Sequence, residues 1–506
     1  MWVIILKLRM FEKISILNIM KDKINENIIY YGDDIEKIRK DYIKLIIFIP
    51  IIAIVSIILL KFSPYFILLN LISIFIYLYP LIATEIKKEE QEKIIENEIP
   101  IFLLFAYVNS LLGKSLYKTF EEIKNSKVFK GMKREALLLI KEVEVLGKSS
   151  ISAMESRAKV HKSDFLGKIY MNYVNGEMIG ISVSERIRDL LEESLDNLKS
   201  LFESYVNKSN DVVEIIFILY LITPMILLAF QYISTSINIF TLLVPLIISP
   251  VVYFFIVIAQ PNMGYEITLL NAEKKALLPI IITVFFSLFL HISLTYKLVI
   301  LYSLFVCFSF LIYYKIKYSD DILNNMPYVL SDIADYVRLG YSIRSSLFKI
   351  RSNNRNFMKF LDKIINNLRK NLPISEVKTN IWAVNAILEF IENIEKKGFA
   401  DTFTFKDASI LLSNYIALRN KILKSLQLFH MLSIMTPLML YFAFGLMSKI
   451  KAIGNLDFII LIYSIILSII YAKLSRFTIF NFPLLLAVLL TMLIIIFLGN
   501  IIIIFI

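Results

Sequence analysis

The sequence predicts an all-α polytopic membrane protein with about nine transmembrane helices and two duplicated cytoplasmic helical-bundle domains. Three observations support this fold class. The 506 residues are 57% hydrophobic, with a mean hydropathy of +0.68, yet 19% are charged. Most charged residues lie in two long blocks that alternate with apolar runs. A motif of Pro, Gly and Ser opens each block, which indicates a duplicated unit.

The apolar runs define the membrane-spanning elements. A run of about 18 apolar residues can cross a hydrocarbon core of roughly 30 Å. Nine stretches meet this length or come close to it: 43–61, 64–84, 213–234, 238–260, 277–293, 297–314, 427–447, 457–473 and 477–501. We therefore expect nine transmembrane helices, the first eight of which pair into four hairpins or close neighbours.

Orientation follows from the distribution of Lys and Arg, which favour the cytoplasmic side of a membrane. With a cytoplasmic N-terminus, only Lys61, Lys297, Lys449 and Lys451 of 55 basic residues lie outside. Both charged blocks are then cytoplasmic, and the spans lie in the cell membrane. The predicted parts are an N-terminal cytoplasmic segment (1–42), a transmembrane hairpin (43–84), a first cytoplasmic helical domain (85–212), a hairpin (213–260), a cytoplasmic loop (261–276), a hairpin (277–314), a second cytoplasmic helical domain (315–426) and the C-terminal transmembrane helices (427–506).

The two cytoplasmic domains share a motif at each end. Twelve residues separate Pro from Gly at the start, and a Ser follows two places later. Each copy closes on Thr-Pro inside an apolar run. The residues of this structural motif are Pro100, Gly113, Ser115, Thr223 and Pro224 in the first copy, and Pro327, Gly340, Ser342, Thr436 and Pro437 in the second.

The residues of this motif are those that typically begin and end the helices of a helical hairpin. Pro suits the first turn of a helix, Gly the position after its end, and Ser the N-cap of the next helix. The closing prolines would free the carbonyls of Tyr220 and Ser433, which a neighbouring Thr hydroxyl can satisfy in a membrane. Each Thr-Pro pair is either a static kink or a flexing point.

Residue patterns for catalysis or cofactor binding are weak. Gly113-Lys114-Ser115 resembles the end of a phosphate loop but lacks the Gly five residues earlier. Only His161 of the three histidines has a carboxylate, Asp164, within one helical turn, which is too few ligands for a metal. Cys307 is a lone cysteine and excludes a disulfide framework. We expect no enzyme activity, no cofactor and no metal, and the first residues do not have the pattern of a signal peptide.

The copies differ in charge. The first domain has 20 basic and 21 acidic residues, while the second has 18 and 11. Six basic residues of the second fall within 22 positions: Arg338, Arg344, Lys349, Arg351, Arg355 and Lys359. Two interpretations remain open. The residues are attracted to the anionic inner leaflet, or they form a docking face for an acidic partner. No stretch of the sequence resembles a recognition helix of a nucleic-acid-binding protein.

A duplicated helical domain that opens Pro-x12-Gly-x-Ser and closes at Thr-Pro in a membrane helix resembles the type II secretion F domain. The number of spans is similar to the archaeal version, the platform of archaella and archaeal type IV pili. The resemblance covers roughly 85–260 and 315–447. The turn Leu146-Gly147-Lys148-Ser149 is replaced by Leu372-Pro373-Ile374-Ser375 in the second copy, which leaves the pairing of helices there open.

The resemblance implies a non-enzymatic platform. Such a protein, expected as a homodimer, anchors a hexameric cytoplasmic secretion ATPase and couples it to the insertion of pilin or archaellin subunits. The six basic residues are then the expected ATPase contacts, so charge reversal at Arg344, Arg351 and Arg355 should weaken ATPase recruitment. The alternative is a membrane transporter built from parallel repeats, since an even number of spans per unit makes the copies parallel.

Overall fold

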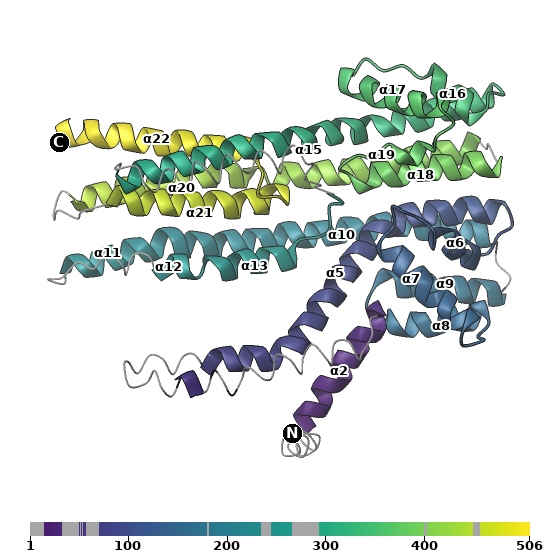
Figure 1. The fold of residues 1–506 in the computed structure, drawn as a ribbon, viewed down its shortest axis with the longest axis horizontal. Helices are drawn as coiled ribbons and strands as arrows, with labels where there is room; N and C mark the ends of the chain where they lie inside the picture. The colour runs from purple at the N-terminus through teal and green to yellow at the C-terminus, as the bar shows by residue number, and fades with distance from the viewer. Residues whose placement is uncertain are drawn as a thin grey trace. The chain divides into compact units, whose positions relative to one another are not determined.

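A computed structural model describes residues 15–32, 50, 52, 54–56, 70–179, 182–233, 244–265, 293–398, 402–448 and 456–505. All the regular structure in these ranges is helical, as the sequence predicts (Figure 1). The chain divides into two compact units, unit 1 (Met1–Asn197) and unit 2 (Leu198–Ile506). Each unit is described by itself.

Unit 1 is a bundle of short helices packed on one long helix. Its helices are α2 (Ser15–Tyr31), α5 (Asn70–Leu111), α6 (Leu116–Ile123), α7 (Gly131–Glu144), α8 (Ser150–Val160), α9 (Phe165–Ile179) and the first part of α10 (Val183–Phe217). Phe102, Phe120 and Tyr170 are fully buried, with the Phe120 ring between the other two at 4.8 and 5.6 Å. These rings join α5, α6 and α9 in one core.

Unit 2 combines long apolar helices with a second bundle. After the π-helix η2 (Ile218–Ile222), its helices are α11 (Thr223–Ile233), α12 (Val244–Ile247), α13 (Ser249–Ala259), α15 (Leu294–Arg338), α16 (Ile343–Lys349), α17 (Arg355–Arg369), the 3₁₀ turn η4 (Ile374–Glu376), α18 (Trp382–Lys397), α19 (Thr402–Ser425), α20 (Leu428–Ser448), α21 (Leu456–Arg476) and α22 (Phe482–Phe505). Helix α15 packs along α19, α21 and α22.

Five helices in the described ranges are long and apolar enough to cross a membrane, which indicates a multi-pass membrane protein. They are Tyr79–Leu111, Val183–Leu227, Leu294–Arg338, Thr402–Gly445 and Asp457–Arg476, with Pro245–Ala259 and Phe482–Phe497 as shorter apolar helices. The predicted spans 43–61 and 277–293 lie mostly outside the described residues, and 64–84 is described only from Asn70 onward.

Apart from Asp457–Arg476, whose apolar window is 67% buried, the other candidate spans are far more exposed than Tyr79–Leu111. The apolar window of Tyr79–Leu111 is 72% buried by protein, whereas that of Val183–Leu227 is 22% buried. Phe102 and Leu103 are completely buried in the core of unit 1. We therefore interpret the apolar end of this helix as bundle core, as the sequence assignment of 85–212 predicts, and not as a lipid-facing surface.

The opening prolines do not begin helices, which corrects the sequence analysis. Pro100 and Pro327 both lie inside continuous helices, α5 and α15. Helix α5 contains a further proline upstream, Pro80, and both helices continue through their prolines at the cost of a backbone hydrogen bond at each. As a result, the helix that enters each bundle is an extension of the apolar helix before it.

Candidate functional site

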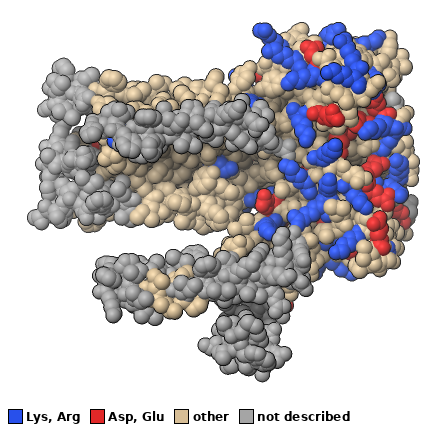
Figure 2. Space-filling model, viewed as in Figure 1, with Lys and Arg blue, Asp and Glu red and all other residues tan. Residues whose placement is uncertain are grey.

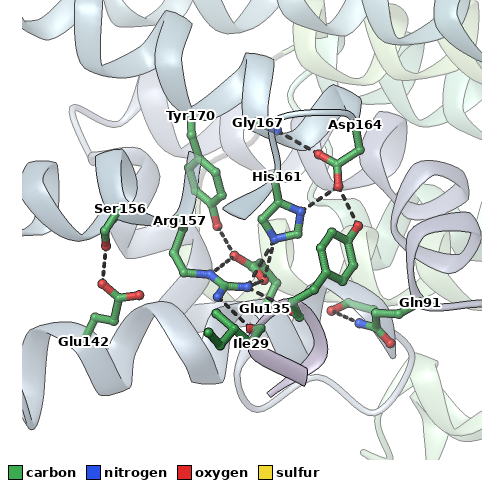
Figure 3. A network of polar contacts seen from close by, with 12 residues as sticks. Ile29, Gln91, Glu135, Glu142, Ser156, Arg157, His161, Asp164, Gly167 and Tyr170 are labelled. Carbon is green, nitrogen blue, oxygen red and sulfur yellow. Dashed lines mark hydrogen bonds and ion pairs between the residues drawn. The ribbon is translucent and has the colours of Figure 1, made fainter. Parts of the chain in front are cut away.

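Unit 1 contains a buried network of ionised side chains (Figure 3). Glu135 on α7 forms an ion pair with Arg157 on α8, with 2.6 Å between Oε2 and Nη2. The side chains of these two residues are 1% and 3% exposed. His161, which ends α8, has Nε2 3.1 Å from Glu135 Oε2 and Nδ1 2.6 Å from Asp164 Oδ2. Two cations therefore face two carboxylates inside the bundle.

Tyrosines complete the network and extend it to another helix. Tyr170 on α9 donates to Glu135 Oε1 at 3.0 Å, and Tyr30 on α2 donates to Asp164 Oδ2 at 2.5 Å. Arg157 also donates to the carbonyls of Ile29 and Tyr30, at 3.3 and 3.2 Å. These carbonyls are at the C-terminal end of α2, where they lack partners within the helix. Arg157 thus caps α2 and fixes it to α8.

The electrostatics favour the fully ionised state. Burial opposes a charge on His161, but the Glu135 and Asp164 carboxylates outweigh it and raise the pKa of the imidazole to about 9. Burial also opposes the charge of Glu135, yet Arg157 and His161 hold the pKa of that carboxyl well below its usual range. The network groups face one another, so their role is to join α2, α7, α8 and α9.

Gly167 allows the first turn of α9 to lie close to the backbone at the end of α8. A Cβ on Gly167 would lie 1.9 Å from the carbonyl oxygen of His161, and the Gly167 N–H donates to Asp164 Oδ1 at 3.1 Å. The sequence analysis found the His161–Asp164 spacing but missed Glu135 and Arg157. Arg157 and His161 are four residues apart and share a helix face, which is a local signal. Glu135 is on another helix, so no local spacing reveals it.

The motif glycines form the predicted turns. Gly113 and Gly340 have φ of 71° and 86°, and the next residue in each case bonds back across the turn: Lys114 N–H to Asn109 O, and Tyr341 N–H to Tyr336 O. Such a left-handed residue commonly ends a helix. Ser342 caps α16 by accepting from the Ser345 N–H, whereas Ser115 has the N-cap backbone shape without a side-chain bond. The capping prediction is therefore confirmed in full for one copy only.

Each bundle has a second turn that contains a left-handed residue. Gly147 (φ 66°) follows α7, and Asn371 (φ 54°) follows α17. Lys148 N–H bonds to Glu142 O, six residues back, and Leu372 N–H bonds to Asn367 O, five residues back. Asn tolerates the left-handed conformation better than most residues. Gly147 and Asn371 thus both end a helix in the left-handed conformation, and the pairing of these helices stays a prediction.

The closing Thr-Pro pairs differ between the copies. Thr223 follows the π-helix η2 and its hydroxyl donates to Ile218 O at 2.9 Å. Thr436 lies inside the continuous helix α20 and donates to Leu432 O at 2.8 Å. The Thr hydroxyls thus satisfy carbonyls one or two positions before those that the sequence analysis named, Tyr220 and Ser433.

The six basic residues of the second domain separate into two groups. Arg344 bonds to Asn371 Oδ1 at 3.2 Å, and Lys349 lies 3.6 Å from the centre of the Tyr341 ring. These contacts keep both side chains near Arg338, at the end of α15. Arg351 and Arg355 instead flank Asn354, the N-cap of α17. The remaining residue, Lys359, is one turn further along α17 and is exposed.

We name the first of these regions the distal tip, defined as the turns 338–344 and 369–372. It carries exposed apolar side chains, Leu339 at 71%, Leu372 at 41% and Tyr341 at 39%. Arg338, Arg369 and Lys370 lie within three residues of Leu339 or Leu372 in the sequence and are also exposed. Arg344 forms an ion pair with Glu395, with 3.2 Å between Nε and Oε1. The distal tip therefore combines an apolar centre with a basic rim.

Comparison with known proteins gives one distant similarity. The chain is 25% identical over 130 residues to the uncharacterized protein MJ1286 of Methanocaldococcus jannaschii. The match covers 25% of this chain and 21% of that protein. No family model matches the sequence. No solved structure matches it either.

Proposed function

We propose that this chain is the membrane platform of an archaeal type IV pilus-like filament machine, an archaellum or a pilus. In this role it anchors a hexameric secretion ATPase and couples the ATPase to insertion of pilin or archaellin subunits. The proposed topology has nine spans in the cell membrane, with the N-terminus and both helical domains in the cytoplasm. Basic residues bordering the spans, such as Lys317 and Lys473, support this orientation.

The observation that carries the proposal is the continuity of α15. This helix has 45 residues and no break from Leu294 to Arg338, so it is about 67 Å long at 1.5 Å per residue. Its first part is the apolar segment 297–314 and its last part is in the second bundle. A force applied to the distal tip can therefore move a span directly, as a coupling device requires.

We place the ATPase contact on the distal tip. An apolar centre with a polar rim is the usual composition of a protein interface. The rim residues Arg338, Arg369 and Lys370 suit an acidic partner surface and would accelerate its association. Pilin contacts are proposed among the apolar helices, where the two Thr-Pro segments lie. A homodimer is the proposed assembly.

Co-purification tests this proposal. The full chain is isolated in mild detergent from its own cells, and the preparation is analysed for a hexameric secretion-type ATPase at low and high salt. We expect the ATPase to be present at low salt and reduced at high salt. Retention at high salt would keep the platform and reject the basic docking face. Absence of any ATPase from folded protein would reject the platform in favour of a transporter, which substrate uptake would then test.

A matched pair of variants locates the contact. R338E/K370E changes the distal tip, and R351E/R355E makes the same change of charge near the N-terminus of α17. We expect the first variant to lose most of the bound ATPase and the second to retain it. The reverse result would move the docking face to α17.

A further inference from the structure

Helix α17 runs parallel to the last part of α15, in the same chain direction. At its N-terminus, Asn356 Nδ2 donates to Asp321 Oδ2 of α15 at 3.0 Å. Beyond its C-terminus, Asn371 accepts from Arg344, which follows the end of α15. The N-terminus of α17 is therefore level with Asp321, and its C-terminus is at the distal tip.

This arrangement gives the two basic groups different heights above the membrane. Asp321 is seven residues beyond Tyr314, the last residue of the predicted span, which is about 10 Å along the helix. Headgroups occupy roughly 5–7 Å outside each edge of the hydrocarbon core. The Debye length is about 8–10 Å at physiological salt, so charges at this height still interact with the lipid surface. Arg338 is about 36 Å beyond the span end, several Debye lengths away.

Three exposed cations occupy the lower level. Arg351 and Arg355 flank the cap of α17, and Lys317 is one turn before Asp321 on the same face of α15. Figure 2 shows Lys and Arg side chains gathered over the α16–α17 end of unit 2. Tyr314, three residues before Lys317, is 57% exposed. Tyrosine at the edge of a span is typical of the headgroup level.

The two acidic residues nearby do not cancel the three cations: Asp320 faces arginines within the protein, and Asp321 contributes a single negative charge. Asp320 has Oδ1 2.9 Å from Arg419 Nη1 and Oδ2 3.9 Å from Arg476 Nη1. Asp321 accepts from Asn356. The basic side chains of Lys317, Arg351 and Arg355 therefore present a net positive surface toward the bilayer.

We propose that Lys317, Arg351 and Arg355 form a site for the phosphate groups of anionic lipids in the cytoplasmic leaflet. Binding is by headgroups alone, because the apolar face of α17 is occupied: Phe357, Phe360 and Leu361 are buried in the bundle. The site holds the base of the second bundle against the membrane. It depends on the span assignment of 297–314 and not on the role of the distal tip.

The test uses the full chain in mild detergent with phosphatidylglycerol as the anionic lipid and phosphatidylcholine as the neutral one. Native mass spectrometry counts the lipids that each variant retains. The site variant is K317Q/R351Q/R355Q. The matched control is R338Q/R369Q/K370Q, which removes the same number of charges at the distal tip.

We expect wild-type protein and the control to prefer phosphatidylglycerol. The site variant should lose this preference, by roughly fivefold in affinity for each charge removed. Equal losses in both variants, or no loss in either, would overturn the proposal. Displacement of phosphatidylglycerol by millimolar inorganic phosphate would also overturn it, since the site would then bind free anions.

Two further readouts separate this proposal from others. Thermal unfolding in phosphatidylcholine should be the same for all three proteins, because the substituted side chains are exposed. The site variant should still co-purify with the ATPase, so failure of the lipid site and failure of the platform give different results.

Discussion

The strongest stability prediction concerns the ion pair of Glu135 and Arg157. Replacing Arg157 by Met leaves the Glu135 carboxylate buried without its main counter-ion and removes two donors from the end of α2. Removing one partner of a buried pair typically costs about 3–5 kcal/mol. Because all the contacts of Arg157 are with α2, α7 and α8, we expect the loss to appear as opening of unit 1.

Hydrogen exchange of the full chain in detergent measures this opening, since it reports local free energies without a two-state assumption. Amides near Ile28–Tyr31 should exchange roughly 100- to 4,000-fold faster in R157M, at tenfold per 1.4 kcal/mol. The control is K159M, which breaks an exposed pair with Glu155 (side chains 68% and 44% exposed) and should cost less than about 1 kcal/mol.

A double variant tests whether the two charges act together. E135M/R157M leaves His161 paired with Asp164, so it should be less destabilised than the two single variants in sum, by about 1–3 kcal/mol. Equal exchange in R157M and K159M, or simple additivity in the double variant, would refute the assignment of this network as the clamp on α2.

Three further predictions follow from the same structure. The pKa of His161 is raised to about 9 from an unfolded value near 6.5, so its favourable contribution is complete below pH 6.5 and disappears as pH rises through 9. The free energy of unfolding from denaturant titrations should therefore fall by up to about 3 kcal/mol between pH 6 and 10, and H161Q should flatten this slope. Gly167→Ala should destabilise by at least about 2 kcal/mol in the same denaturant assay, because its Cβ would meet the His161 carbonyl. Gly176→Ala, whose Cβ has only a contact at 3.8 Å, should be neutral or stabilising, and equal effects at both sites would contradict the close approach. Asn371→Ala should destabilise by about 1 kcal/mol more than Asn371→Gly, since both lose the side chain but only Ala is strained at φ 54°; thermal unfolding compares them.

The sequence predicted features that depend on local chemistry. Gly113 and Gly340 end helices because the left-handed conformation favours glycine, and the amphipathic spacing after Ser342 places Ile343, Leu347 and Ile350 in the core. The helical class and the apolar character of α15, α20 and α21 follow from composition alone.

Features set by tertiary contacts were not predictable in this way. Pro100 and Pro327 suit a helix start, but the helices that contain them are stabilised by packing on both sides of the proline. The partner of Arg157 is 22 residues away on another helix, a separation that no local pattern encodes. The division of the basic residues between the distal tip and the base of α17 depends on the direction of α17 along α15.

Filament assembly in cells tests the platform most directly. Cells lacking this chain are examined by electron microscopy for surface filaments, and then complemented with wild-type protein or with R338E/K370E. The account predicts no filaments of one type in the deletion, full recovery with wild-type protein, and poor recovery with the variant despite normal membrane levels. Normal numbers of every filament type in the deletion strain would contradict the proposed function.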